Sequence, residues 1–181
     1  MSDIIRNPTA PDVDPRRMPY QLPFPKEAQS EIVIPSVIPE DERFWVPQAE
    51  NVWFRPLCLN ASQGYWVNLL RVRRAGILSR HRHPAPVHGH VLRGRWHYME
   101  HDWVAETGSY VFEPPGETHT LVVSDDCAEM ITLFHITGVM IYVDPWGKQT
   151  GFEDVFSKID MCREHYRKVG FDDSVLNGFI R

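Results

Sequence analysis

Cysteine is scarce in this chain, and long apolar runs are missing. The three cysteines among the 181 residues, Cys58, Cys127 and Cys162, are widely spaced and form no Cys-x-x-Cys pair. This argues against a disulfide framework or a cysteine-rich zinc site. No segment approaches the 20 or so apolar residues of a membrane span, and Met1–Ala10 lacks the pattern of a secretory signal. We therefore expect a cytoplasmic protein with reduced thiols.

Positive charge is also in short supply. Lys and Arg number 19 against 24 Asp and Glu, which gives a formal net charge of -5, and the basic residues form no patch interleaved with aromatics. Nucleic acid and membrane are therefore not expected as partners. The length and the hydrophobic content of 43% suit a single domain with a sizeable core.

Proline is concentrated at the start of the chain. Nine of the fifteen prolines lie in residues 1–47, where they disfavour helix and central strands. We predict an extended arm there, which lies on the rest of the domain or reaches a neighbouring subunit. Glu31–Pro35 and Phe44–Val46 are apolar enough to pack as edge strands.

Short β-prone runs alternate with turns in the middle of the chain, and no helical pattern separates them. This regularity is typical of an all-β antiparallel sandwich or barrel, here a jelly roll over residues 48–147. The expected strands are Val52–Leu59, Tyr65–Arg73, Ile77–His83, Val87–Leu92, Arg95–Met99, Tyr110–Phe112, Thr118–Val123, Glu129–Ile136 and Val139–Val143.

Residues 148–181 carry a helical pattern. Thr150 and Glu153 have the spacing of a capping box, and Gly170 is placed to end a helix. We predict an amphipathic helix that packs on the barrel. Its apolar residues recur at intervals of three and four: Phe152, Val155, Phe156, Ile159, Cys162 and Tyr166.

Two pieces of sequence predict a divided metal site. His81 and His83 are two apart on one expected strand, so their side chains point to the same face. The rigid turn Pro114–Gly116 precedes His119 at the head of another strand and aims that imidazole back across the sheet. Three neutral imidazoles with open positions suit iron, copper, nickel or zinc.

These pieces resemble the two motifs of the cupin superfamily, G-x5-H-x-H-x4-E-x6-G and G-x5-P-x-G-x2-H-x3-N. The second motif matches from Gly108 to His119 and departs at Val123, where the family has asparagine. In the first, the glutamate position falls on His88 when counted from His83 and on Val87 when counted back from Gly94. The two counts leave the facing of His88 open, but neither places a carboxylate there. The resemblance implies a cupin-type antiparallel jelly-roll β-barrel, with the extended arm and the C-terminal helix added to it.

Within the superfamily, residues 81–98, 101–106 and 113–121 resemble the 2,4'-dihydroxyacetophenone dioxygenases. That resemblance implies Fe(II) held by His81, His83 and His119. It implies the conversion of the aromatic hydroxyketone and O2 into 4-hydroxybenzoate and formate. Separately, we expect a homo-oligomer, a dimer or a tetramer.

For the α-proton of the substrate we expect His88, if it faces inward, or the hydroxyl of Tyr98 as the catalytic group. Glu113 or Glu117 orients a ligand imidazole or lies in a solvated loop. Two other activities stay open: a cupin dioxygenase that cleaves a β-diketone or a flavonol, and a non-enzymatic cupin that holds zinc or senses a small molecule.

Overall fold

The computed structural model describes residues 14–181, which form two compact units that divide between Ser30 and Glu31. The first unit contains one short 3-10 helix, Pro15–Arg17, and is otherwise extended, with Tyr20 and Phe24 exposed. The arm predicted over residues 1–47 stays a prediction, because residues 31–47 belong to the second unit. The part of that arm formed by residues 1–13 lies outside the described residues.

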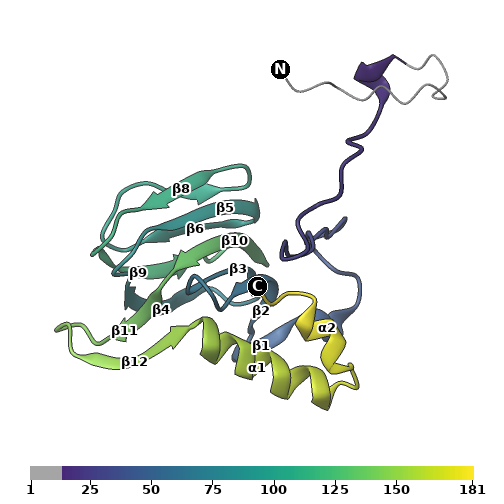
Figure 1. Cartoon of the computed structure of the whole chain (residues 1–181). Coiled ribbons are helices and arrows are strands. Elements are labelled where there is room, and N and C mark those ends of the chain that lie inside the picture. Colours follow the sequence, from purple (N-terminus) through teal and green to yellow (C-terminus); the bar gives the residue numbers. More distant parts are fainter. Residues whose placement is uncertain (1–13) are drawn as a thin grey trace. The chain divides into compact units, whose positions relative to one another are not determined.

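The second unit is a sandwich of two antiparallel six-stranded sheets (Figure 1). The strand order is β1-β2-β3-β10-β5-β8 in sheet A and β12-β11-β4-β9-β6-β7 in sheet B. The strands of sheet A are β1 (Val46–Ala49), β2 (Val52–Asn60), β3 (Tyr65–Val72), β5 (Val87–Arg93), β8 (Tyr110–Glu113) and β10 (Met130–Thr137). The strands of sheet B are β4 (Gly76–Arg82), β6 (Arg95–Tyr98), β7 (Ala105–Glu106), β9 (Thr118–Val123), β11 (Val139–Val143) and β12 (Gln149–Asp154).

Each strand predicted between residues 52 and 143 is present, and the all-β antiparallel fold is confirmed. The prediction was wrong at the edges. Glu31–Pro35 forms no strand, and the strand expected at Phe44–Val46 begins at Val46 instead. The short β7 and the exposed β12 were not predicted, because neither has a run of alternating apolar residues.

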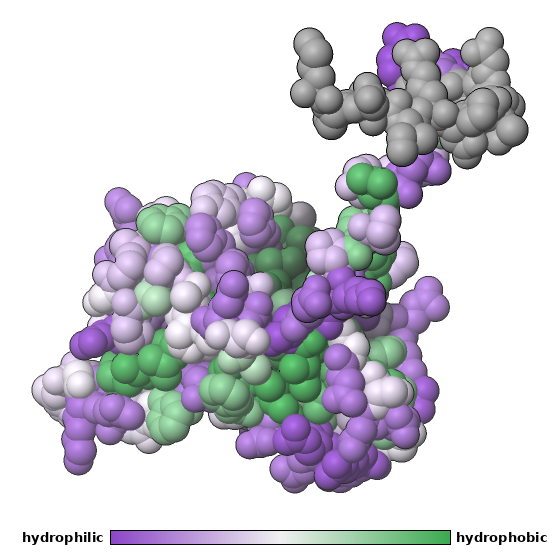
Figure 2. Space-filling model, in the orientation of Figure 1, coloured by the Kyte–Doolittle hydropathy of each residue, from purple (hydrophilic) through white to green (hydrophobic). Residues whose placement is uncertain are grey.

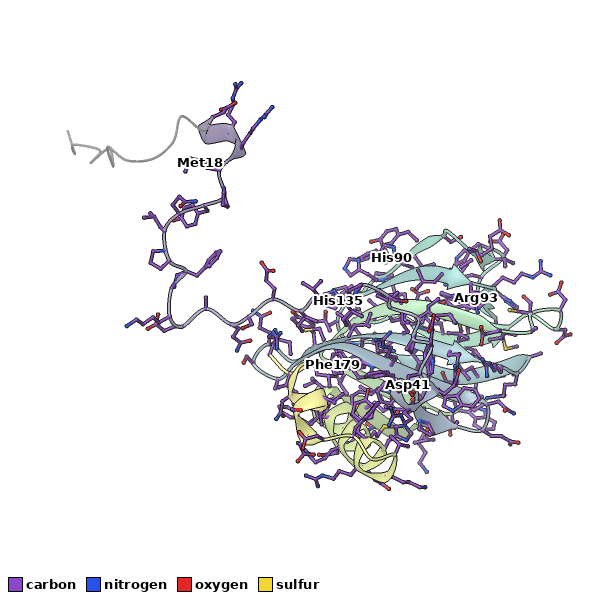
Figure 3. All side chains as sticks on the ribbon, turned by 90° about the vertical axis from the view of Figure 1, so that its right-hand side faces the viewer. Met18, Asp41, His90, Arg93, His135 and Phe179 are labelled. Atoms are coloured by element: carbon purple, nitrogen blue, oxygen red, sulfur yellow. The ribbon has the colours of Figure 1, made fainter. Side chains whose placement is uncertain are left out.

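The core lies between the sheets, and side-chain alternation along each strand fills it. In β5, Val87 and Val91 are buried while His88 and His90 face outward. Figure 3 labels His90 and, on the neighbouring strand β10, His135. Large aromatic rings fill much of the space between the sheets, and Trp66 and Trp96 are fully buried. The sandwich therefore has a ring-rich interior around the cavity described below.

Helix α1 (Val155–Lys168) packs its apolar face against this core, and α2 (Asp173–Asn177) follows it. The predicted start at Thr150 was wrong, because Thr150 pairs in β12 and the helix begins after Asp154, whose side chain accepts from the Ser157 backbone N–H. In Figure 2, apolar surface lies between the barrel and the hydrophilic outer face of α1. No helix within residues 14–181 is long and apolar enough to cross a membrane.

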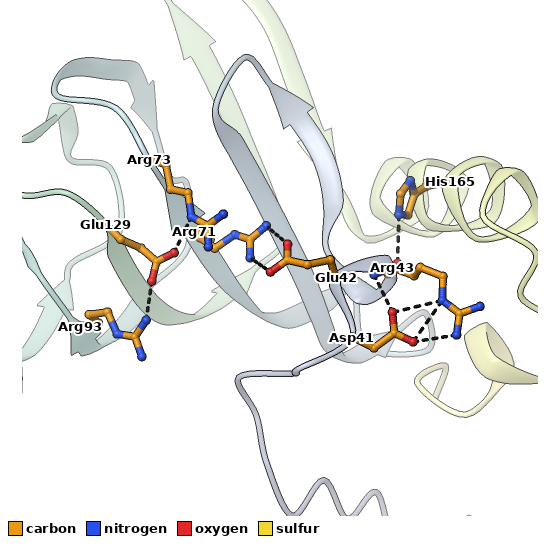
Figure 4. Close-up of polar contacts among 8 residues, drawn as sticks. All are labelled: Asp41, Glu42, Arg43, Arg71, Arg73, Arg93, Glu129 and His165. Atoms are coloured by element: carbon orange, nitrogen blue, oxygen red, sulfur yellow. Dashed lines mark hydrogen bonds and ion pairs between the residues drawn. The ribbon is translucent and has the colours of Figure 1, made fainter.

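An ion pair ties residues 41–43 to sheet A, and a hydrogen bond ties them to α1 (Figure 4). Glu42 forms a two-pronged pair with buried Arg71 on β3, at 2.8 and 3.0 Å. The guanidinium of Arg71 also lies over the ring of Trp45, 4.2 Å from its centroid. On the other side, His165 of α1 contacts the backbone oxygen of Arg43 at 3.0 Å. The segment before β1 is therefore fixed to the barrel on two sides.

Candidate metal centre

Three buried histidines converge on sheet B. His81 lies on β4 and His119 lies directly opposite it on the paired strand β9, while His83 follows one residue after β4 ends. Each side chain is 5% exposed or less. One nitrogen from each ring lies within 4.8 Å of the other two. The predicted alternation therefore places all three imidazoles on the same inner face.

The ring nitrogens are arranged as metal ligands are. The Nε2 atoms of His81 and His119 lie 3.2 Å apart. Two imidazole nitrogens that bind one metal at about 2.1 Å in adjacent positions lie about 3.0 to 3.4 Å apart. The Nδ1 of His81 bonds to the Ser79 hydroxyl at 3.1 Å, so its Nε2 is free to face the centre. The donor set thus fits a divalent metal ion.

Burial keeps these imidazoles neutral, which metal binding requires. It lowers the pKa of His83 to about 4. It also lowers the pKa of His119 to about 3, with help from the nearby His83 and His101. The pKa of His81 is lowered well below its usual range by burial first and then by its two histidine neighbours. All three rings therefore carry lone pairs at neutral pH.

Glu113 and Tyr98 complete the polar interior of the site. The Tyr98 ring stacks on His119 with centroids 3.7 Å apart and planes inclined by 7°. Its hydroxyl donates to Glu113 Oε1 at 2.5 Å. The other oxygen, Oε2, lies 3.4 Å from His119 Nε2 and 3.6 Å from His83 Nε2. Within residues 14–181 this oxygen has no hydrogen-bond partner. Burial raises the pKa of the Glu113 carboxyl to about 7, even though the bond from Tyr98 lowers it.

Backbone contacts hold the two halves of the site together. Gly116, whose φ of +91° suits glycine, donates its N–H to the His83 carbonyl at 2.7 Å. Next to His119, the backbone N–H and hydroxyl of Thr120 both donate to the Glu100 carboxylate, at 2.7 and 2.8 Å. The turn before β9 and the end of β6 therefore fix where the His119 ring points.

A comparison with protein families matches residues 35–140 to the ChrR Cupin-like domain. The chain belongs to that cupin family. A comparison with curated proteins finds no match. Among solved structures, an RmlC-like cupin from Ralstonia eutropha JMP134 is similar at 25% identity, with a TM-score of 0.65 over 71% of this chain and 84% of its own. An acetylacetone dioxygenase from Acinetobacter johnsonii is similar at 15% identity, with a TM-score of 0.62 over 76% of this chain and 97% of its own.

A cavity of about 490 Å³ opens beside the histidines of this cupin. Its walls combine apolar side chains from both sheets with a few polar groups. His81, His83, Tyr98 and Glu113 line part of it. Trp66 and Asn68 on β3 line it as well, and the indole Nε1 and the amide Oδ1 have no partner within the described chain. The cavity has the size and character of a small-molecule site.

The structure shows which of the two counts gives the glutamate position of the first cupin motif. Val87 is buried and lines the cavity, so the count back from Gly94 gives the residue at the glutamate position. His88 points outward, where its Nδ1 bonds to the Tyr110 hydroxyl at 2.8 Å. The structure brings Tyr98 to the three histidines and does not bring His88 there.

For Glu113 and Glu117 the sequence allowed two roles: to orient a ligand imidazole or to lie in a solvated loop. Glu113 is 2% exposed and faces the histidines, whereas Glu117 bonds to His101 at 2.5 Å instead. In β8, Tyr110 and Phe112 are exposed, so alternation puts Val111 and Glu113 on the inner face. The sequence gives no sign of this, because two large aromatic residues would be expected to face the core and the carboxylate the solvent.

Proposed function

We propose that this cupin is a non-haem Fe(II) dioxygenase that cleaves the carbon–carbon bond next to the carbonyl of an aromatic α-hydroxyketone. The reaction converts 2,4'-dihydroxyacetophenone and O2 into 4-hydroxybenzoate and formate. The observation that carries the proposal is the buried cluster of His81, His83 and His119 on the wall of a cavity that is partly lined by aromatic rings. Its motif resemblance to the hydroxyacetophenone dioxygenases supports the choice of substrate.

The three histidines would hold the metal. The three neutral rings bring no negative charge to a divalent ion, which favours a substrate that binds as a chelating anion. An α-hydroxyketone becomes such an anion when it loses a proton. Bound Fe(II) would supply the redox chemistry with O2.

Tyr98 and Glu113 are placed to handle the proton of the substrate. The pKa of the Tyr98 phenol is raised well above its usual range by burial and by the Glu113 charge, so the phenol acts as a hydrogen-bond donor. It holds Glu113 Oε1, which leaves the unpartnered Oε2 facing the histidine nitrogens. In this mechanism Oε2 accepts the α-proton and Tyr98 keeps the carboxylate in place. The outward His88 takes no part.

The cavity walls would bind the ring of the substrate. Leu70, Leu78, Leu121, Phe134 and Ile136 give an apolar lining that suits an aromatic ring. Apolar side chains around the reacting groups also reduce their contact with water and so limit wasteful oxidation. The chain's own contribution is therefore to bind, orient and shield both reactants.

The deciding experiment measures metal content and O2 uptake on the same sample. Protein purified without oxygen is assayed for iron and zinc, then mixed with 2,4'-dihydroxyacetophenone while O2 and 4-hydroxybenzoate are followed. We expect iron near one per chain and one 4-hydroxybenzoate per O2. His119→Ala should lose metal and turnover together, whereas the exposed His90→Ala serves as the matched control and should lose neither. A fully active His119→Ala protein would overturn the proposal.

A β-diketone is the second candidate substrate, because the similar fold of the acetylacetone dioxygenase from Acinetobacter johnsonii spans nearly all of that enzyme. Iron with O2 uptake on acetylacetone, and none on the hydroxyketone, would favour this substrate. Zinc with no O2 uptake on either compound would favour a non-enzymatic sensor. A cytoplasmic location and a dimeric or tetrameric assembly remain predictions from the sequence. The division of the chain into an arm (1–47), a barrel (48–147) and a C-terminal part (148–181) also remains a prediction.

A further inference from the structure

A buried ion pair lies on the cavity wall apart from the histidine cluster. Lys158 of α1 is only 2% exposed, and its Nζ lies 2.6 Å from Glu153 Oε2 on β12. Lys158 Nζ also donates to Gln48 Oε1 at 3.2 Å and sits 4.3 Å from the centroid of the Phe54 ring. Gln48, Glu153 and Lys158 all line the same cavity as the histidines.

Attachment of the helix does not explain this pair. Removing two charges from water costs several kcal/mol per ion, and well-packed apolar side chains would often hold a helix as well or better. Helix α1 already buries Val155, Ile159, Cys162 and Tyr166 against the core. The charged pair lies where α1 lines the cavity, and we therefore relate it to the ligand that the cavity binds.

The strand order gives the distance between the pair and the histidines. His81 on β4 pairs with Tyr142 on β11, and β11 pairs in turn with β12, which carries Glu153. Tyr142 pairs with Gly151, two residues before Glu153, so two steps between strands (about 10 Å) and two residues along β12 (about 7 Å) separate the Cα atoms of His81 and Glu153 by about 12 Å. A benzene ring with a substituent at each end of its long axis is shorter than this by a few ångströms. An aromatic ketone held near the histidines can therefore reach toward the pair with its far substituent.

Unlike this pair, two other polar atoms of the cavity wall have no hydrogen-bond partner within residues 14–181. Asn68 is 4% exposed, and its Oδ1 accepts no hydrogen bond from residues 14–181. The buried indole N–H of Trp66, two residues earlier on the same face of β3, donates none within that range. Buried polar atoms without partners are costly, so their presence on a cavity wall indicates a ligand that carries donors and acceptors of its own.

We propose that Lys158, held by Glu153 and Gln48, recognises the phenolic hydroxyl on the ring of the substrate. This assignment deepens the proposed function and rests on it. An ammonium N–H donates to the phenol oxygen while the adjacent carboxylate accepts the phenol proton, so the pair satisfies both halves of a hydroxyl. A ring without the hydroxyl forms neither of these two hydrogen bonds, and the site selects against it.

The test compares 2,4'-dihydroxyacetophenone with 2-hydroxyacetophenone, which lacks the ring hydroxyl. The double variant Lys158→Met and Glu153→Gln removes both charges at once, so that no lone charge stays buried. We expect the ratio of kcat/KM for the two compounds to fall about 10- to 100-fold, as for the loss of a hydrogen bond to a charged group. Metal content should not change. The exposed Lys168→Met on the same helix is the matched control and should keep the ratio.

A purely structural role gives a different result. If the double variant lowers kcat/KM for both compounds by the same factor, the proposal is overturned. If the double variant does not fold, Gln48→Met keeps the ion pair and removes one of its supports. That variant should lower the ratio several-fold, and an unchanged ratio would overturn the proposal.

Binding separates this proposal from the proposed function. If the wild-type protein turns over neither compound, the proposed function fails, and calorimetry with 4-hydroxyacetophenone and acetophenone decides the role of Lys158. A preference for the hydroxylated ring that disappears in the variant supports recognition by the pair. Equal affinity of the wild-type protein for both rings rejects it.

Discussion

The Tyr98 side chain makes two contacts that one substitution can separate. Its ring stacks on His119, and its hydroxyl holds Glu113. Tyr98→Phe keeps the stacking and removes the hydroxyl, so metal content should stay the same. We expect kcat/KM to fall about 10- to 100-fold, because Glu113 loses a charge-assisted hydrogen bond of about 1.5 to 3 kcal/mol.

The matched control for this substitution is Tyr110→Phe. The Tyr110 hydroxyl bonds to His88 on the outer face of the sheet, and its loss should leave the rate unchanged. Steady-state O2 uptake and metal analysis on both variants measure the effect. A Tyr98→Phe enzyme with the wild-type rate would contradict the role given to Glu113, since the carboxylate would then need no support.

Sequence alone predicted the metal-ligand candidates well and their neighbours poorly. His81, His83 and His119 follow from spacing, because alternation on a strand and a Pro-Gly turn are local rules. The inward carboxylate of Glu113 and the pair of Lys158 with Glu153 depend on residues far apart in the chain. No local sequence pattern predicts that Glu113 on β8 meets Tyr98 on β6, or that Lys158 of α1 lines the cavity.

Asp154 is the cap on which helix α1 starts. Its side chain accepts from the Ser157 backbone N–H at 2.8 Å, and the Ser157 hydroxyl accepts from the Asp154 backbone N–H at 2.8 Å. Asp154→Ala removes the first bond and should lower the free energy of unfolding by about 0.5 to 2 kcal/mol. Urea unfolding followed by circular dichroism measures this loss.

Asp160→Ala on the exposed face of the same helix is the comparison for the cap. Its ion pair with Arg163 lies on the surface and contributes little. If the two variants lose equal stability, the cap does not act as described. The sequence also offered Thr150 and Glu153 as a capping box, and that signal was misleading because the strand pairing of β12 with β11 has priority over it.

Gly94, between β5 and β6, is required by both its backbone angle and its surroundings. Its φ is +74°, and a Cβ there would lie 2.6 Å from Cys127 Sγ and even closer to the Glu129 carbonyl oxygen. Gly94→Ala therefore combines backbone strain with overpacking, and we expect a loss of about 2 to 5 kcal/mol.

Gly64 gives a matched comparison, with a similar φ of +68° but no atom within 4 Å of an added Cβ. Gly64→Ala should cost only the strain, about 1 kcal/mol. Thermal or urea unfolding of both variants measures the difference. Equal losses would mean that crowding against the backbone near Glu129 plays no part.

The whole molecule without metal should become less stable on acidification. Between pH 4.5 and 6.5 the unfolded chain binds protons at three ordinary histidines, while burial holds the folded-state pKa values of His83 and His119 at about 4 and 3 and that of His81 well below its usual range. These groups favour the folded state above pH 6.5, and that preference is lost as the pH falls.

Glu113 acts with the opposite sign, because its folded-state pKa is raised to about 7. It adds stability below its unfolded value of 4.5 and loses this contribution as the pH rises through about 7. Three histidines outweigh one carboxyl, so the unfolded chain holds about two more protons near pH 5.5. The free energy of unfolding should then rise by about 1 to 3 kcal/mol per pH unit.

Urea titrations at pH 5, 6 and 7 in the presence of a chelator measure this slope. His83→Gln removes one of the three groups and should make the slope shallower. A stability of the metal-free protein that is independent of pH in this range would contradict the burial of neutral imidazoles described above.

His81, His119 and Tyr98 belong to sheet B, His83 follows directly after β4, and Glu113 reaches the centre from sheet A. A bound metal ion would therefore act as a cross-link that closes the 38-residue loop between His81 and His119 before the two sheets need to meet. Loop closure of that kind is a large part of the entropic barrier to pairing β4 with β9. A metal ion bound there would assist assembly of sheet B, whereas the Glu113 carboxylate would join the site only when the sandwich closes. Under the proposed function, a chain with bound metal would therefore become active only after that last step.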